Sequence, residues 1–195
     1  MTGRPPSPRN LVPFQPQRIP HHFVDLLVIG GGVAGLRAAM EADPALSVLI
    51  VTKDALRESS SAYAQGGIAG VMAPEDEFAN HVRDTLVAGG GLCDPAVVES
   101  VVREAPQHIR DLIDWGTRFD LADDGELRLG REGGHSHHRI AHAFGDATGR
   151  EIMRAMRRYA RERLAAQIWE NTFTIDLHTV PGEADQHECR GALVW

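Results

Sequence analysis

The segment D-L-L-V-I-G-G-G-V-A-G at residues 25–35 decides the fold that this sequence predicts. Residues 26–29 are continuously apolar and predict a buried strand, and residues 46–51 predict a second one. Between them lies a helical apolar pattern, formed by Val33, Leu36, Ala39 and Met40. Strand, helix and strand in this order predict an α/β fold of the Rossmann-like kind, with three layers and a mostly parallel central sheet.

The glycines of this segment follow the pattern G-x-G-x-x-G, which in this context predicts a cradle for a dinucleotide. Gly30 permits a tight turn, Gly32 lets the backbone approach a pyrophosphate, and Gly35 lets the helix pack against the strand. Phosphates would then lie at the positive N-terminus of the helix. The alternative is a glycine-rich turn that binds no ligand.

The composition narrows the function classes. The chain has 195 residues and a formal net charge of -7, which argues against a general nucleic-acid-binding protein, because such proteins carry a basic field. No stretch approaches the roughly 20 apolar residues of a membrane helix. Since an apolar signal-peptide core is also missing, the sequence predicts a cytoplasmic protein without a membrane segment. Cys93 and Cys189 lie far apart and predict free thiols.

The chain is expected to divide into a proline-rich disordered tail, residues 1–22, and a domain from residue 23 to residue 195. Residues 56–70 are rich in Ser, Gly and Ala and are expected to lie along a ligand. The last residues, 193–195, are apolar and predict a strand end that needs a neighbouring strand to pair with. The sequence therefore indicates a truncated domain.

Several local signals predict further elements. Asp94 followed by Pro95 predicts the start of a helix that ends at Gly116, and Pro106 is expected to kink it or to begin a second helix. Another helix is expected from Thr148, with its arginines mostly on a solvated face. Strands are expected over residues 173–180 and 191–195.

Four segments carry a resemblance to a known family. They are S-S-A-Y-A-Q-G-G-I-A at residues 60–69, D-T-L-V-A-G-G-G-L-C-D at 84–94, R-E-G-G-H-S-H-H-R-I at 131–140 and D-A-T-G-R-E at 146–151. In this order they resemble the L-aspartate oxidases, flavoproteins related to the flavin subunits of succinate dehydrogenase and fumarate reductase. The resemblance covers residues 24–195.

The resemblance implies an FAD-binding domain and oxidation of L-aspartate to iminoaspartate, the first step of de novo NAD biosynthesis. Electrons would pass to oxygen or fumarate, and quinolinate synthase is a candidate partner. The flavin performs the hydride transfer, while the protein supplies position and charge.

The resemblance also implies which residues contact FAD. These are Gly30, Gly31, Gly32, Val33, Ala34, Gly35, Lys53, Ser60, Ser61, Ala62, Tyr63, Ala64, Gln65, Gly66, Gly67, Phe173 and Thr174. Lys53 departs from the general rule that an acidic residue ends this strand and binds the ribose, and Asp54 is the alternative ribose partner. Ser60 stands where the succinate dehydrogenase branch has a histidine bonded to FAD, so the flavin is expected to be non-covalent.

Two residues are implied to contact the substrate. Glu132 would face the ammonium group that L-aspartate has and succinate lacks, through a charge-assisted hydrogen bond. The alternative is that Glu132 caps a turn or pairs with Arg131. His135 would help to hold a substrate carboxylate.

Four histidines lie close together in the sequence and could in principle bind zinc or copper; they are His135, His137, His138 and His142. No thiolate or carboxylate set with clear ligand spacing accompanies them, so no metal site is predicted.

In the resembling enzymes the acid/base arginine belongs to a capping domain that follows this region. Neither that domain nor the C-terminal helical domain is expected in residues 1–195, so the chain is expected to be an N-terminal part that is catalytically inactive by itself. Two alternatives stay open. One is a fumarate reductase or succinate dehydrogenase type of flavoprotein, against which Glu132 and Ser60 argue. The other is a non-catalytic nucleotide-binding remnant.

Overall fold

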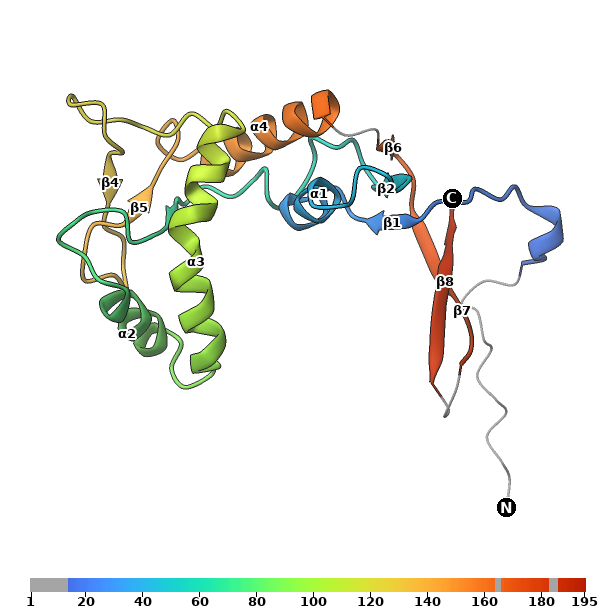
Figure 1. The fold of residues 1–195 in the computed structure, drawn as a ribbon, viewed down its shortest axis with the longest axis horizontal. Coiled ribbons are helices and arrows are strands. Elements are labelled where there is room, and N and C mark those ends of the chain that lie inside the picture. The colour runs from blue at the N-terminus through green and yellow to red at the C-terminus, as the bar shows by residue number, and fades with distance from the viewer. Residues whose placement is uncertain (1–13, 164–165, 183–185) are drawn as a thin grey trace, which may run out of the picture. The chain divides into compact units, whose positions relative to one another are not determined.

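The computed structural model describes residues 14–163, 166–182 and 186–195 (Figure 1). The chain divides into two compact units. The first unit comprises Met1–Glu58 and Leu164–Trp195, and the second unit comprises Ser59–Arg163.

The first unit contains a parallel sheet in the strand order β1-β2-β6. β1 (Leu26–Ile29) pairs with β2 (Val48–Val51), which pairs on its other side with β6 (Gln167–Trp169). All residues of β2 are buried, as expected of a central parallel strand. α1 (Val33–Met40) connects β1 to β2 and buries Leu36 and Ala39. The predicted α/β fold with a parallel sheet is therefore confirmed.

An antiparallel hairpin completes the first unit. β7 (Thr174–Pro181) pairs with β8 (His187–Val194), and Phe173 exchanges two backbone hydrogen bonds with Trp195, both 2.8 Å long. Both predicted strands are present, but β8 begins four residues before the expected position 191. Its first residues are polar and exposed, so no apolar pattern marks them.

The described part of the predicted tail, residues 14–22, contains a short 3-10 turn, η1 (Pro16–Arg18). Residues 1–13 of that tail lie outside the described residues. In the part of the chain that the structure describes, no helix has both the length and the apolar character needed to cross a bilayer.

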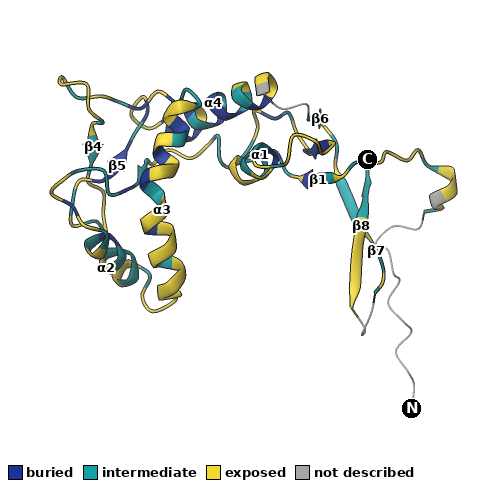
Figure 2. Ribbon diagram, viewed as in Figure 1, coloured by how far each residue is buried: buried dark blue, intermediate teal, exposed yellow. Residues whose placement is uncertain are grey.

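The second unit combines helices with a small antiparallel sheet. The helices are α2 (Phe78–Ala88), α3 (Pro95–Asp114) and α4 (Thr148–Arg163). The sheet has the order β3-β5-β4, with β3 (Ile68–Ala69), β5 (Ile140–Ala141) and β4 (Leu129–Gly130). Figure 2 shows that the buried residues of α3 lie mainly in its C-terminal half, whereas its N-terminal half is largely exposed.

α3 begins and ends where the sequence predicts. Asp94 caps it, with Oδ1 accepting from the Ala96 amide at 2.9 Å, and the helix gives way to Gly116 at a φ of +93°. Pro106 lies inside the helix, so the alternative of a second helix is wrong. Pro106 is buried in the same helix face as Ile109, and this packing outweighs the hydrogen bond that proline cannot make.

The helix predicted from Thr148 is confirmed as α4. Its arginines are not all solvated, however. Arg154 donates to Glu151 from Nε and NH2, both at 2.7 Å, and to the Gly116 carbonyl oxygen at 2.7 Å. Glu151 is buried and also accepts from the Arg118 amide. This ion pair therefore fixes the start of α4 against the end of α3.

Candidate functional site

In the first unit, the turn between β1 and α1 brings backbone atoms closer than side chains would allow. Gly30 adopts a φ of +108°, in the region that favours glycine. A Cβ on Gly35 would lie 1.9 Å from the Gly30 carbonyl oxygen. Gly32 occupies the N-cap of α1 and has no side chain to cover the first-turn amides. The turn therefore has the form of an anion cradle at a helix N-terminus.

The other predicted residues of the first unit gather at the carboxyl ends of β1 and β2. The Gly30 amide donates to the Val51 carbonyl oxygen at 2.8 Å, and Thr172 donates to the carbonyl oxygen of Thr52 at 2.9 Å. Lys53 and the pair Phe173 and Thr174 directly follow these anchored positions, and Lys53 and Phe173 are exposed. Ligands of open α/β sheets bind at this end of the strands.

In the second unit, residues 60–67 lie against the start of α4. The Gly149 amide donates to the Ala64 carbonyl oxygen at 3.0 Å, and a Cβ on Gly149 would lie 2.1 Å from the Ser61 carbonyl oxygen. A Cβ on Gly67 would lie 2.5 Å from the carbonyl oxygen of Ala141 in β5. The remaining members are Ser60, Tyr63, Gln65 and Gly66, which are exposed, and Ala62, which is half-buried. Residues 60–67 thus combine a fixed backbone with an accessible surface.

Glu132 lies beside this segment. Its Oε2 is 3.9 Å from the position of a Cβ on Gly66, while its Oε1 is 3.4 Å from Nε2 of His142. The two carboxylate oxygens therefore face different neighbours. The side chain of Glu132 therefore pairs with His142 and not with Arg131, the partner that the sequence suggested as an alternative.

A buried charge network anchors the other end of residues 131–139. Arg139 is completely buried and donates to both carboxylate oxygens of Asp76, from Nε at 2.7 Å and from NH2 at 2.9 Å. Its NH1 donates to Oδ2 of Asp84, on α2, at 2.7 Å. The amide and the hydroxyl of Ser136 donate to the same Oδ2 at 2.8 and 2.6 Å.

Both aspartates of this network are held in the ionised form. Burial raises the pKa of Asp76, but hydrogen bonds from Arg139 and the Glu77 amide lower it by more. Burial likewise raises the pKa of Asp84, and hydrogen bonds from Ser136 and Arg139 lower it well below its ordinary value. The network is therefore an ion triad with extra donors.

His135 contacts this network. Its Nδ1 is 3.2 Å from NH1 of Arg139, and its ring centroid is 5.5 Å from that of His81. His81 is buried, and its Nδ1 has no hydrogen-bond partner among the described residues. Burial, followed by the charge of Arg139, lowers the pKa of His81 below its ordinary value. The sequence motifs do not single out Arg139, Asp76 or His81, although two of the segments that carry the family resemblance contain Arg139 and Asp84.

The histidine-rich loop is not arranged around a metal. Nδ1 of His137 is 3.6 Å from Asp76, and Nδ1 of His138 is 3.3 Å from the Leu129 carbonyl oxygen. Within residues 14–163, 166–182 and 186–195, no three His, Cys, Asp or Glu side chains are placed to hold a metal ion. Each histidine of the loop has a protein neighbour of its own.

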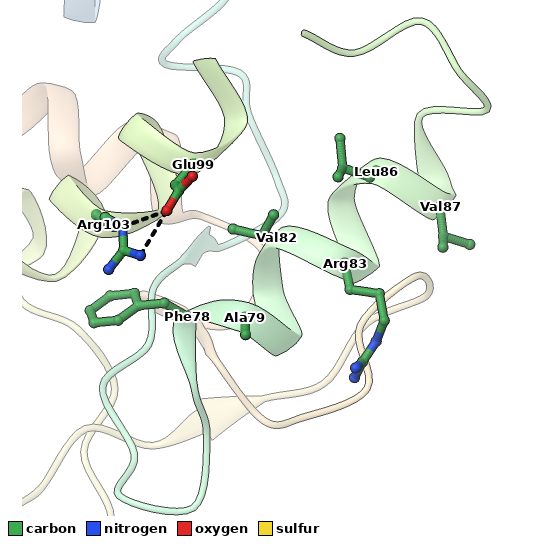
Figure 3. A pocket seen from close by; sticks show the side chains of 8 residues that line it. All are labelled: Phe78, Ala79, Val82, Arg83, Leu86, Val87, Glu99 and Arg103. Atoms are coloured by element: carbon green, nitrogen blue, oxygen red, sulfur yellow. Dashed lines mark hydrogen bonds and ion pairs between the residues drawn. The ribbon is translucent and has the colours of Figure 1, made fainter. Parts of the chain in front are cut away.

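A separate groove lies between α2 and α3 (Figure 3). Its α2 side includes Phe78, Val82 and Leu86, and its α3 side is an ion pair in which NH2 of Arg103 lies 2.7 Å from Glu99. None of the lining residues belongs to the predicted cofactor or substrate contacts.

Residues 25–195 match the model of the family described as FAD binding domain. The chain belongs to this FAD-binding domain family. It is 48% identical over 157 residues to the chloroplastic L-aspartate oxidase of Arabidopsis thaliana, covering 80% of this chain and 24% of that protein. It is 47% identical over 156 residues to L-aspartate oxidase of Streptomyces coelicolor, covering 80% and 27%. The resemblance noted in the sequence is thereby confirmed.

A solved structure supports the same family at the level of the fold. A quinol-fumarate reductase with menaquinol molecules matches with a TM-score of 0.80 and 29% identity, over 88% of this chain and 29% of that one. The chain thus spans about a quarter of the length of the curated relatives described above.

The residues of this FAD-binding domain fit the cofactor that the family implies. The 1.9 Å approach between a Cβ on Gly35 and the Gly30 carbonyl oxygen shows that only glycine is accommodated where the turn meets the helix. The uncapped N-terminus of α1 offers amides for a diphosphate. FAD, predicted from the sequence, is confirmed as the cofactor class, while the individual contacts stay predictions.

Proposed function

We propose that this protein is the FAD-binding part of an L-aspartate oxidase, which oxidises L-aspartate to iminoaspartate and passes the electrons to oxygen or fumarate. Its identity with curated L-aspartate oxidases over four fifths of the chain supports this proposal. When bound, FAD supplies the two-electron oxidation of the substrate's carbon–nitrogen bond. The first step of de novo NAD biosynthesis is the corresponding role in metabolism.

The observation that carries the proposal is the orientation of Glu132. His142 engages Oε1 of its carboxylate at 3.4 Å, and Oε2 lies on the side of Gly66, inside the segment predicted to contact FAD. Glu132 is exposed, so this carboxylate is accessible to a ligand. An ammonium group there would form a charge-assisted hydrogen bond. The ammonium group is the feature by which L-aspartate differs from succinate.

We assign the cofactor to the small residues of the β1–α1 turn, to Lys53, Phe173 and Thr174, and to residues 60–67. The binding is non-covalent, because the Ser60 hydroxyl replaces the histidine that forms the covalent link in the succinate dehydrogenase branch. His135 is assigned to a substrate carboxylate. The cytoplasmic location and quinolinate synthase as partner belong to the same proposal.

The second candidate is a fumarate reductase, which the structural match to quinol-fumarate reductase favours. Such an enzyme handles a dicarboxylate without an ammonium group. For such a substrate the Glu132 carboxylate would have no cationic group with which to form a charge-assisted hydrogen bond. Glu132 therefore favours the oxidase.

The test uses the protein expressed from its complete coding frame and loaded with FAD. L-aspartate is expected to bleach the flavin absorbance without oxygen, succinate is expected to leave it unchanged, and fumarate is expected to restore the colour. Bleaching by succinate alone would establish the second candidate, and bleaching by neither would establish a non-catalytic nucleotide-binding protein. Acid precipitation checks the linkage, since non-covalent FAD leaves with the supernatant and covalent FAD stays in the pellet.

A further inference from the structure

Arg139 is immobilised more completely than its neighbours in the loop. Nε and NH2 of its guanidinium donate to Asp76, and NH1 donates to Asp84, each over 2.7 to 2.9 Å. Its backbone amide donates to Gly130, and its carbonyl oxygen accepts from Gly70. Because the side chain is fully buried, no water competes for these bonds. The plane of the guanidinium is therefore fixed.

The same guanidinium faces one particular nitrogen of His135. NH1 lies 3.2 Å from Nδ1. A guanidinium nitrogen donates hydrogen bonds only and keeps its proton in proteins. Nδ1 must therefore accept, which requires that it carries no proton. A neutral imidazole whose Nδ1 accepts carries its hydrogen on Nε2.

The neighbours of the His135 ring leave its second nitrogen available. His81 packs against the ring with the ring planes at 57°, and burial, followed by the charge of Arg139, lowers the pKa of His81 below its ordinary value. Nε2 of His135 has no hydrogen-bond partner among residues 14–163, 166–182 and 186–195. The proton on Nε2 is thus left for a ligand.

We propose that Arg139 is a positioning residue that selects the tautomer of His135, so that Nε2–H donates a hydrogen bond to a substrate carboxylate. The contact between Nε2–H and a substrate carboxylate rests on the proposed function, because only that function identifies the ligand as a dicarboxylate. The tautomer itself follows from the geometry of the second unit alone. Asp76 and Asp84 take part by fixing the guanidinium.

The structure provides an internal control. Nδ1 of His138 lies 3.3 Å from the carbonyl oxygen of Leu129, and a carbonyl oxygen can only accept. His138 must therefore carry its proton on Nδ1 when it makes this bond. Two histidines three residues apart are expected to show opposite tautomers.

The test is nitrogen NMR of the FAD-loaded full-length protein with 15N-labelled histidine. It is recorded about one and a half pH units above the ordinary histidine pKa of about 6.5. The His135→Gln variant assigns the His135 signals. A predominant Nε2–H form for His135 beside a predominant Nδ1–H form for His138 supports the proposal. A predominant Nδ1–H form, or an equal mixture, at His135 overturns it.

Two further variants separate the tautomer from its use. Arg139→Met is expected to shift His135 towards a mixture and to leave His138 unchanged; if this variant does not fold, the wild-type spectrum decides. His135→Leu, which has no donor, is expected to weaken binding of succinate, used as an unreactive dicarboxylate probe, about tenfold, and His138→Leu to leave it unchanged. Unchanged succinate binding in His135→Leu overturns the carboxylate contact even where the tautomer is as expected. The histidine signals do not depend on whether the protein oxidises L-aspartate, so a failure of the proposed function can be distinguished from a failure of this proposal.

Discussion

Arg139 and Asp76 form a two-pronged ion pair in which both side chains are almost inaccessible to solvent, 0% and 1% exposed. Nε and NH2 of the arginine each donate to a different oxygen of the aspartate, at 2.7 and 2.9 Å. Arg139 immediately precedes β5, and Asp76 precedes α2. The pair therefore ties residues 131–139, which include Glu132 and His135, to the helical part of the second unit.

The first prediction concerns the stability that this pair confers. Asp76→Asn removes the charge and leaves a buried guanidinium incompletely paired, so the free energy of unfolding is expected to fall by about 3–5 kcal/mol. Urea titration followed by circular dichroism measures the change. Asp123→Asn, at an exposed position, is the control and is expected to stay within about 0.5 kcal/mol. Equal stability of the two variants would show that the pair contributes nothing.

The second prediction is the loss of stability in acid. The pKa values of Asp76 and Asp84 are lower in the folded chain than their unfolded value of about 3.9. Their contribution is therefore complete above that value and is lost as the pH falls below it. The free energy of unfolding is expected to decline steeply below about pH 4. Asp84→Asn should flatten this decline but not abolish it, because Glu151 also has a lowered pKa in the folded chain. Burial raises the pKa of Glu151, but hydrogen bonds from Arg154 and the Arg118 amide lower it by more. Parallel curves for the wild type and Asp84→Asn would contradict the assignment.

The third prediction tests the cradle in the first unit. Gly35→Ala places a methyl group where the Gly30 carbonyl oxygen lies 1.9 Å away, so α1 must shift from β1. This is expected to cost about 1–3 kcal/mol of stability and, by moving the turn, more than about tenfold in FAD affinity measured by calorimetry. Gly191→Ala is the control, because a Cβ there meets nothing within 4 Å. FAD affinity equal to that of the control would refute a role for this close approach.

Much of the fold was predictable because its signals are local. The apolar strands and the helix around the glycines are read from adjacent residues, as are the Asp94 cap and the Gly116 end of α3. α2 was missed because Glu77 at its N-cap makes no side-chain capping bond and Asn80, His81 and Thr85 are weak helix formers. The spacing of its apolar residues was the available signal; they are Phe78, Val82 and Leu86.

The candidate site was predictable only in part, because its geometry depends on pairings between distant residues. The sequence motifs identify Glu132 and residues 60–67, but not that Glu132 lies beside Gly66. Asp76 and Arg139 are 63 positions apart, so no periodicity connects them. The short strands β3 and β5 are likewise defined by their pairing across the second unit. An arginine directly before the apolar strand β5 was the one available sign of a buried ion pair.

The most direct test of Glu132 as the residue that selects L-aspartate is a comparison of two activities in Glu132→Gln, made in the FAD-loaded protein from its complete coding frame. The variant is expected to lose about a hundredfold in kcat/KM for L-aspartate, because the hydrogen bond to a charged group is weakened. Fumarate reduction, whose substrate has no ammonium group, is expected to stay within about twofold. The exposed Glu126→Gln serves as control for both activities. Equal losses of aspartate oxidation and fumarate reduction in Glu132→Gln would contradict the role of Glu132.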